Sequence, residues 1–396
     1  MASRSVMRPL SGGSTGRSHV SVRGCVAAGR GVLPIALWAG LPALLTVRTL
    51  LRLGVTHTQF AGDFHYAFWP AGQRVLHGLS PYVAPGAAAV RHAVAFVYPA
   101  VGALVLAPLA LLPHALADNA FALLNLGAIL LTLRVLAVRD WRLYGAALLC
   151  APVFSGWSLA NVTLLLGLGV AVAWRYRDRA LIAGPLIALL VSVKLFLWPL
   201  ALWLVATRRY AAVGYGALCG LVLNAVAWLT LGLDEVHRYS RLMDALVRAE
   251  ERHGYSLISL SLRFGASHFG AYALAILIAI VAATVCIVLG RAGRDLGALA
   301  LALAVSIVAT PIVQLHYFAL LVVPFAVARP RLSLAWALPL AFWACWTPTR
   351  SWQVAGALAL GTAMLVVTLR SASSPLPAPR PLAPTRRKRK LAPAPS

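Results

Sequence analysis

The sequence predicts an all-α polytopic membrane protein, a bundle of about 12 transmembrane helices with further helices in its outer loops. Of its 396 residues, 61% are apolar and only 11% are charged. Soluble domains have about 45–50% apolar and about 25% charged residues. Long apolar runs, several of a length that suits a bilayer, recur from residue 32 to residue 370. Together these observations exclude a chain made of one or two water-exposed domains.

Charge distribution supports the same class. Thirty-five basic residues stand against ten acidic ones, for a net charge of +25. In a soluble protein this balance would indicate a nucleic-acid partner. Here the basic residues fall in short clusters between apolar runs, as they do in cytoplasmic loops, so we expect no nucleic-acid partner. The five cysteines are far apart along the chain, and we expect neither a disulfide framework nor a metal site.

The basic clusters divide the chain. Residues 1–31 are predicted to be a disordered basic cytoplasmic tail, 32–370 the transmembrane domain, and 371–396 a disordered, Pro-rich, polybasic cytoplasmic tail. If all the clusters lie inside, both termini are cytoplasmic. The segment 97–113 is then interfacial or re-entrant, although a crossing there, which would invert the later loops, stays open. The predicted spans are 32–53, 119–138, 143–157, 159–174, 180–193, 195–207, 210–232, 271–290, 295–310, 312–328, 332–347 and 351–370.

Two outer loops, 54–96 and 233–270, stand out between these spans. In the second, apolar side chains recur at helical spacing from Val236 to Val247, and charged residues cover the opposite face. The pattern predicts an amphipathic helix on the membrane surface.

Asp63 is the acidic residue without a simple structural role. Asp140, Asp178 and Asp295 lie within Arg clusters, Asp118 suits an N-terminal cap of the second span, and the acidic residues around 234–251 suit solvated pairing. Asp63 instead follows the first span among aromatic residues. Partial desolvation there would raise its pKa and favour a general base. Catalysis and capping both remain open from the residues alone.

Three cationic or hydrogen-bonding groups fall on the same predicted side: Lys194, Arg263 and His316. Each has a plain alternative, namely snorkelling for Lys194, interfacial anchoring for Arg263 and a structural role for His316. With one carboxylate, they suit group transfer from an anionic phosphate leaving group. We expect no metal and no cofactor, because Asp63 has no carboxylate neighbour in the sequence.

Several motifs together resemble glycosyltransferase family 87, which includes polyprenol-phosphate-mannose-dependent mannosyltransferases of the GT-C membrane fold. They are an Asp after the first span, Gly78-Leu79-Ser80-Pro81-Tyr82, Tyr98-Pro99, and the segment 107–113. The resemblance extends over about residues 33–370. It implies that Asp63 is the general base and that Lys194 matches the family's lysine after the fifth span. Thr310 to His316 resembles a family element that ends in His, with Gln314 in place of Trp.

The chain also departs from the family pattern. Ala160-Asn161-Val162-Thr163 stands where Gly-Gln-x-Asn is usual, and Gly254-Tyr255-Ser256-Leu257 replaces Asn-Gln-Ser-Leu, while Arg263 is kept. These departures leave the identity of donor or acceptor open. The resemblance implies donor-phosphate binding by Lys194, Arg263 and His316. The candidates for lining the substrate cavity are Tyr82, Tyr98, Asn161, Thr163 and Gln314.

The expected function is a membrane glycosyltransferase. It would move a sugar, with mannose expected, from a polyprenyl-phosphate donor to a lipid or glycan acceptor, with inversion at the sugar carbon. The expected location is the extracytoplasmic side of the bacterial inner membrane, with membrane lipids as further partners. The main rival is a transporter or flippase of a lipid-linked glycan, for which Asp63 would be dispensable. A structural membrane partner is a third interpretation.

Overall fold

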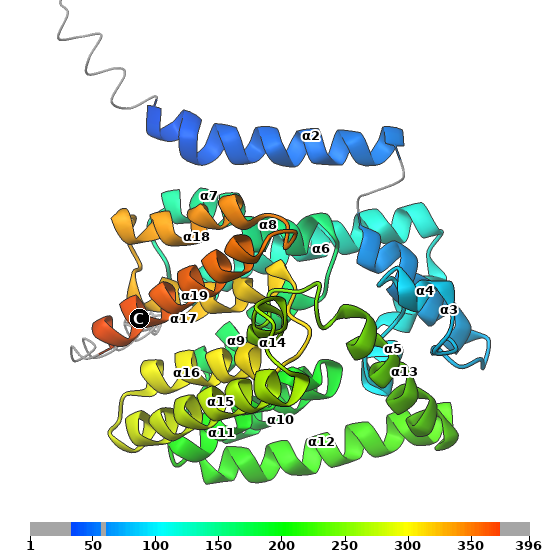
Figure 1. Cartoon of the computed structure of the whole chain (residues 1–396). Helices are drawn as coiled ribbons and strands as arrows, with labels where there is room; N and C mark the ends of the chain where they lie inside the picture. The colour runs from blue at the N-terminus through cyan, green and yellow to red at the C-terminus, as the bar shows by residue number, and fades with distance from the viewer. Residues whose placement is uncertain (1–32, 57–60, 373–396) are drawn as a thin grey trace, which may run out of the picture.

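The computed structural model describes residues 33–56 and 61–372, so nearly all of the two predicted tails lies outside it (Figure 1). Every regular element within these ranges is helical, which confirms the all-α class. The α-helices are α2 (Leu41–Thr56), α3 (Trp69–Leu76), α4 (Ala88–Arg91), α5 (Ala100–Leu106), α6 (His114–Val135), α7 (Arg142–Leu149), α8 (Ala151–Ser158), α9 (Thr163–Arg175), α10 (Ala180–Val193), α11 (Pro199–Ala206), α12 (Tyr210–Leu231), α13 (Asp234–Glu250), α14 (Leu257–Arg263), α15 (His268–Arg291), α16 (Asp295–Val308), α17 (Val322–Ala328), α18 (Ala337–Ala341) and α19 (Ser351–Ser371). Tighter or wider helical turns are η1 (Ala36–Gly40), η2 (Phe64–Phe68), η3 (Ala107–Leu111), η4 (Leu195–Leu197), η5 (Leu315–Leu321), η6 (Leu334–Trp336) and η7 (Phe342–Cys345).

Four of the described helices, α6, α12, α15 and α19, are long and apolar enough to cross a membrane. Other predicted spans correspond to shorter apolar helices, such as α9 and α10, with 13 and 14 residues. Such helices are only about 20 Å long, less than the hydrocarbon core of about 30 Å. Membrane character is therefore supported, and twelve crossings stay a prediction.

Proline accounts for one break within the predicted spans. The single span expected at 143–157 is two helices, α7 and α8, which meet at Cys150 in an extended conformation. Pro152 follows in the first turn of α8, where a missing backbone N–H costs nothing. Between α10 and η4 the helical path is also broken, because Lys194 has an extended backbone, with φ −145° and ψ 97°. The interruptions place polar groups inside the bundle.

Close packing of small residues holds the helices together. At Gly184 on α10, an added Cβ would lie 2.1 Å from the backbone oxygen of Ala212 on α12. At Gly145 on α7, an added Cβ would lie only 1.8 Å from the backbone oxygen of Trp38 in η1. Small residues at such crossings let backbones approach, which is the usual way helices associate in a bilayer.

Charged groups join three predicted inner loops. The Arg209 guanidinium lies 2.8 Å from the Asp178 carboxylate and 2.6 Å from that of Asp295. Arg177 also contacts Asp295, at 3.3 Å. The expected pairing of Asp178 and Asp295 with arginines is confirmed. The loops before α10, α12 and α16 therefore meet at one place.

Asp140 joins two more of the predicted inner loops. Its carboxylate accepts hydrogen bonds from Arg142, at 2.9 Å, and from the backbone N–H of Leu332, also at 2.9 Å. The Arg142 hydrogen bonds lower the pKa of Asp140 to about 2. In Figure 1, α3, α4, α5 and α13 gather at the end of the bundle opposite the C-terminal end of α19.

The segment 97–113 forms α5 and η3, which pack on α3, and α5 also contacts α10 and α12. Asp118 differs from its prediction. Helix α6 begins at His114 with Pro113 at its N-cap, so Asp118 lies in the second turn and cannot cap the helix. Its carboxylate instead contacts the imidazole of His65 at 2.7 Å.

Candidate functional site

Backbone contacts fix the position of Asp63. The N–H of Ala61 donates to Ser158 O at 2.8 Å, and the N–H of Asp63 donates to Leu159 O at 3.0 Å. Directly after Asp63, Phe64 is buried and stacks on Phe121 of α6, with ring centroids 4.5 Å apart. The segment that carries Asp63 is thereby attached to the end of α8 and to α6.

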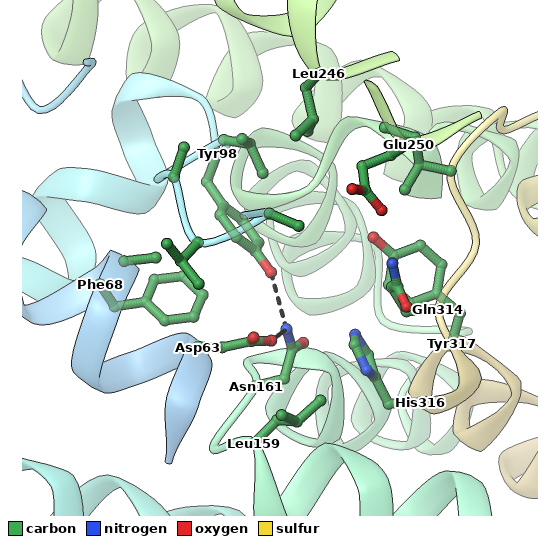
Figure 2. A pocket seen from close by; sticks show the side chains of 16 residues that line it. Asp63, Phe68, Tyr98, Leu159, Asn161, Leu246, Glu250, Gln314, His316 and Tyr317 are labelled. Atoms are coloured by element: carbon green, nitrogen blue, oxygen red, sulfur yellow. Dashed lines mark hydrogen bonds between the residues drawn. The ribbon is translucent and has the colours of Figure 1, made fainter. Parts of the chain in front are cut away.

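Asn161 connects this carboxylate to the interior. Its amide nitrogen donates to Asp63 Oδ2 at 2.5 Å and to the Tyr98 hydroxyl at 3.2 Å (Figure 2). Its amide oxygen accepts from the backbone N–H of Thr163 at 2.9 Å and from the Thr163 hydroxyl at 2.6 Å. With both ends of the amide bonded, Asn161 is held in one orientation.

The same hydrogen-bonded chain ends at a lysine. Lys194 Nζ, buried between α10 and η4, donates to the Thr163 hydroxyl at 3.2 Å. It also lies 4.0 Å from the ring centroid of Tyr317 and 5.3 Å from those of Tyr98 and Phe196. Aromatic faces attract a cation without neutralising it, so the ammonium keeps capacity for an anion.

Two cavities share walls at Tyr98 and Tyr317. The first has a volume of about 230 Å³, and its polar lining includes Asp63, Asn161, Glu250, Gln314 and His316 (Figure 2). The second has a volume of about 540 Å³ and a mainly apolar lining that includes Leu195, Phe196, Trp198, Val236, Met243 and Val247, with Lys194 among them. A polar chamber thus adjoins a larger apolar one, with a buried cation at their junction.

His316 is a hydrogen-bonding group without a partner. Its side chain is 2% exposed, and neither ring nitrogen makes a hydrogen bond within the described ranges. Figure 2 shows the ring beside the space in front of Asn161, with Gln314 nearby. Buried polar groups are normally satisfied, so a substrate group is a natural partner for this imidazole.

Helix α13 covers both cavities. The amphipathic helix predicted from the spacing is confirmed, and its apolar residues, including Val236 and Met243, face the second cavity, while Leu246 lines both. Glu250, assigned from sequence to solvated pairing, instead lines the first cavity with Asp63. The apolar face of α13 is therefore turned toward the site.

Three predicted residues line neither cavity, and one of them, Thr163, is fully buried and bonded to Asn161. Tyr82 is buried behind Tyr98, and its hydroxyl donates to the Tyr98 carbonyl oxygen at 3.1 Å. Arg263, at the end of α14, donates to the backbone oxygen of Arg252 at 2.7 and 2.9 Å and lines neither cavity. The structure brings Asp63, Asn161, Gln314 and His316 together around the first cavity and does not bring Arg263 to it.

Sequence reasoning missed Tyr317, Phe196 and Glu250. Tyr317 lines both cavities and stacks on Phe196, with centroids 4.8 Å apart and planes 10° apart. Their positions directly after His316 and two residues after Lys194 were signals that could have found them. Nothing local distinguishes Glu250 from its charged neighbours on α13.

The charges and hydrogen bonds around Asp63 suit a carboxylate that accepts a proton from a fixed position. Burial raises the pKa of Asp63, while the Asn161 hydrogen bond and the charge of Lys194 oppose that rise. The carboxylate retains partial exposure toward the cavity. It can therefore accept a proton from a hydroxyl group that enters the chamber.

The fold and site define a multi-helix membrane protein with a carboxylate chamber that opens beside an apolar cavity. Residues 96–324 match the model of glycosyltransferase family 87. This match covers more than half of the chain, and the protein belongs to that family, so it is a glycosyltransferase. No curated protein and no solved structure matches the chain.

Proposed function

We propose that this glycosyltransferase transfers a sugar, with mannose the leading candidate, from a polyprenyl-phosphate donor to a lipid or glycan acceptor, with Asp63 as general base. The observation that carries the proposal is the hydrogen-bonded series Asp63, Asn161, Thr163 and Lys194, which joins a carboxylate to a buried ammonium. The carboxylate lines the polar cavity and the ammonium lines the apolar one. A lipid-phosphate sugar has the same order of parts: sugar, phosphate, apolar chain.

Each part of the donor has a complementary surface. The isoprenoid would lie against the apolar lining that α13 and η4 provide. The phosphate would lie at Lys194, with the His316 imidazole within the adjoining chamber as a second hydrogen-bonding group. The sugar would then occupy the polar cavity in front of Asp63. Arg263 has no part in this arrangement, because it lines neither cavity.

The proposed reaction is a single displacement. Asp63 accepts the proton of the acceptor hydroxyl as the oxygen forms a bond to the anomeric carbon. The bond between that carbon and the phosphate oxygen breaks, and its electron pair leaves with the phosphate, whose charge Lys194 stabilises. A single carboxylate base and no covalent intermediate imply inversion, so a β-linked donor gives an α-linked product. Glu250 lines the same chamber and is available to bind hydroxyl groups of the sugar or acceptor.

The arrangement of charges supports an extracytoplasmic site with the GT-C plan. Arg209 and Asp140 bring predicted cytoplasmic loops together. The elements α3, α4, α5 and α13 lie at the end of the bundle away from the C-terminal end of α19 (Figure 1). With the positive-inside rule, both termini would face the cytoplasm of a bacterial inner membrane.

The proposal is tested with the purified chain in liposomes that contain polyprenyl-phosphate [³H]mannose and an extract of acceptor lipids. We expect labelled glycolipid and released polyprenyl phosphate in equal amounts. GDP-[³H]mannose in place of the lipid donor should give no product. Movement of the labelled donor between leaflets without a new glycosidic bond would contradict the proposal and favour a flippase.

A further inference from the structure

A second group of ligand-type side chains lies outside both cavities, at the N-terminal end of α6. His65 Nδ1 is 2.7 Å from Asp118 Oδ2, and His114 Nε2 is 3.9 Å from Asp118 Oδ1. One ligand atom from each of the three residues can be chosen so that all lie within 4.8 Å of one another. Their residue types are the nitrogen and oxygen donors that transition metals take from proteins.

Ring stacking holds the two imidazoles side by side. The His114 ring lies between those of His65 and Trp69, with centroid distances of 3.9 and 4.0 Å and interplanar angles of 12° and 13°. The edge nitrogens of both imidazoles therefore lie beside the same carboxylate. A site assembled in this way is preorganised, because little side-chain freedom is lost on binding an ion.

Among the described residues, only one of the two oxygens of the Asp118 carboxylate has a hydrogen-bond partner. Asp118 Oδ1 is buried and accepts no hydrogen bond from any described residue. His114 Nε2, which lies 3.9 Å from this oxygen, is instead 3.1 Å from the backbone oxygen of His65. A buried carboxylate oxygen without a partner is costly, and a cation at this point would remove the cost.

We propose that His65, His114 and Asp118 bind a late first-row divalent cation such as Zn²⁺. Two ligand atoms on a tetrahedral zinc ion lie about 3.4 Å apart, and the observed 2.7 and 3.9 Å fall on either side of that value. Binding requires His114 Nε2 to exchange the His65 carbonyl oxygen for the ion. Water would complete the coordination, because the His65 and His114 side chains are 28% and 32% exposed. Mg²⁺ and Ca²⁺ fit less well, since they prefer sites made entirely of oxygen.

Such an ion would join η2 to α6. Its ligand His65 lies two residues after Asp63, so the ion would stabilise the segment that carries this carboxylate. From the sequence we expected no metal site, because Asp63 has no carboxylate neighbour and the cysteines are far apart. The present cluster joins segments separated by 53 residues.

Zinc binding by the full-length protein in detergent, purified without a polyhistidine tag, tests the proposal. Zn²⁺ alone is the probe, followed by calorimetry and by the thermal unfolding temperature. We expect one saturable site per chain and a rise in Tm with zinc. His114→Gln should weaken binding at least about 100-fold, because even outer-shell partners of a metal contribute 10–100-fold. His92→Gln, an exposed histidine of the same region, should leave both quantities unchanged.

A second variant distinguishes the loss of the zinc site from misfolding of the protein. Asp118→Asn keeps the shape of the side chain but removes its charge, and its Tm without zinc reports whether the fold is intact. X-ray absorption at the zinc edge should show nitrogen and oxygen ligands without sulfur. Wild-type zinc affinity in His114→Gln, sulfur in the coordination sphere, or no saturable binding by the wild type would each overturn the proposal.

Discussion

One amide nitrogen of Asn161 donates to both the Asp63 carboxylate, at 2.5 Å, and the Tyr98 hydroxyl, at 3.2 Å. The amide oxygen is held by Thr163, so Asn161 cannot turn without the loss of several hydrogen bonds. Asp63 is therefore directed into the polar cavity by a side chain that is itself fixed. This is the arrangement that a catalytic carboxylate requires from its surroundings.

In the proposed mechanism Asn161 positions Asp63, so Asn161→Ala should lower kcat about 100-fold, the scale of loss when a reacting group is misplaced. The KM for the lipid donor should change much less, because Lys194 and the apolar cavity are retained. Steady-state kinetics with polyprenyl-phosphate mannose check this split. Asn119→Ala, which removes an exposed amide bonded only within α6, is the matched control and should keep wild-type kinetics. A rise in KM with unchanged kcat would contradict the positioning role.

Lys194→Gln should raise the KM for the donor by at least about 10-fold, because loss of one partner of a desolvated charge pair costs about 2–5 kcal/mol. Lys194→Arg should restore part of the donor affinity. Binding of polyprenyl phosphate alone, measured by displacement of a fluorescent analogue, separates a phosphate role from a structural one. Equal phosphate affinity in wild type and Lys194→Gln would rule out the lysine as the phosphate ligand.

The effect of a blocked apolar cavity on sugar transfer should depend on the length of the donor lipid. Met243 lines this cavity, so Met243→Trp should impair transfer from a long-chain polyprenyl donor more than from a short-chain analogue. Arg241→Trp on the exposed side of α13 controls for a bulky ring on that helix. The ratio of kcat/KM for the two donors is the measurement. The same ratio in Met243→Trp and wild type would place the lipid elsewhere.

Arg263→Gln should leave transfer within about twofold of wild type, as a surface substitution outside the cavities does. It should lower Tm slightly, because the guanidinium holds the Arg252 carbonyl oxygen with two hydrogen bonds. Kinetics and thermal unfolding of the same preparation are the measurements. A large rise in donor KM would restore Arg263 as a phosphate ligand.

Acid should weaken the contact between the loops around Asp140 and Leu332. The pKa of Asp140 is lowered from 3.8 to about 2, so its stabilising contribution is full above about pH 4 and is lost as pH falls toward 2. Asp140→Asn should therefore lower Tm at pH 6 and flatten the change in Tm over this window. Asp234→Asn, at the exposed start of α13, is the control and should follow the wild-type curve. Identical acid profiles of Asp140→Asn and wild type would show that the interaction contributes nothing.

Much of the class could be predicted from the sequence, because composition and apolar run length depend directly on burial in lipid. The helix at 234–250 was predictable for a similar reason, since its periodicity is local. Its inward orientation was not: the contact of Leu246 with both cavities depends on how α13 folds back over the bundle. Glu250 was missed for the same reason, because only the placement of α13 over the bundle brings it to the first cavity.

Asp118 shows a different limit. Whether it caps a helix or faces another segment depends on where α6 begins, and α6 begins at His114, five residues before the predicted start of the span at residue 119. Asp63, Lys194 and His316 were candidates from residue type and position alone, and the family resemblance gave each of them an expected role. The link between Asp63 and Lys194 through Asn161 and Thr163 required the three-dimensional structure, because it joins three separate segments.

The most direct test of the account is the rate of sugar transfer by Asp63→Asn, measured at equal protein abundance with saturating polyprenyl-phosphate mannose. Asp234→Asn, a carboxylate of the same predicted side that lines neither cavity, is the control and should transfer at the wild-type rate. Loss of a general base predicts a fall of about 10²–10⁴-fold in kcat for Asp63→Asn, with donor binding retained. Transfer by Asp63→Asn at the wild-type rate would contradict the proposed mechanism.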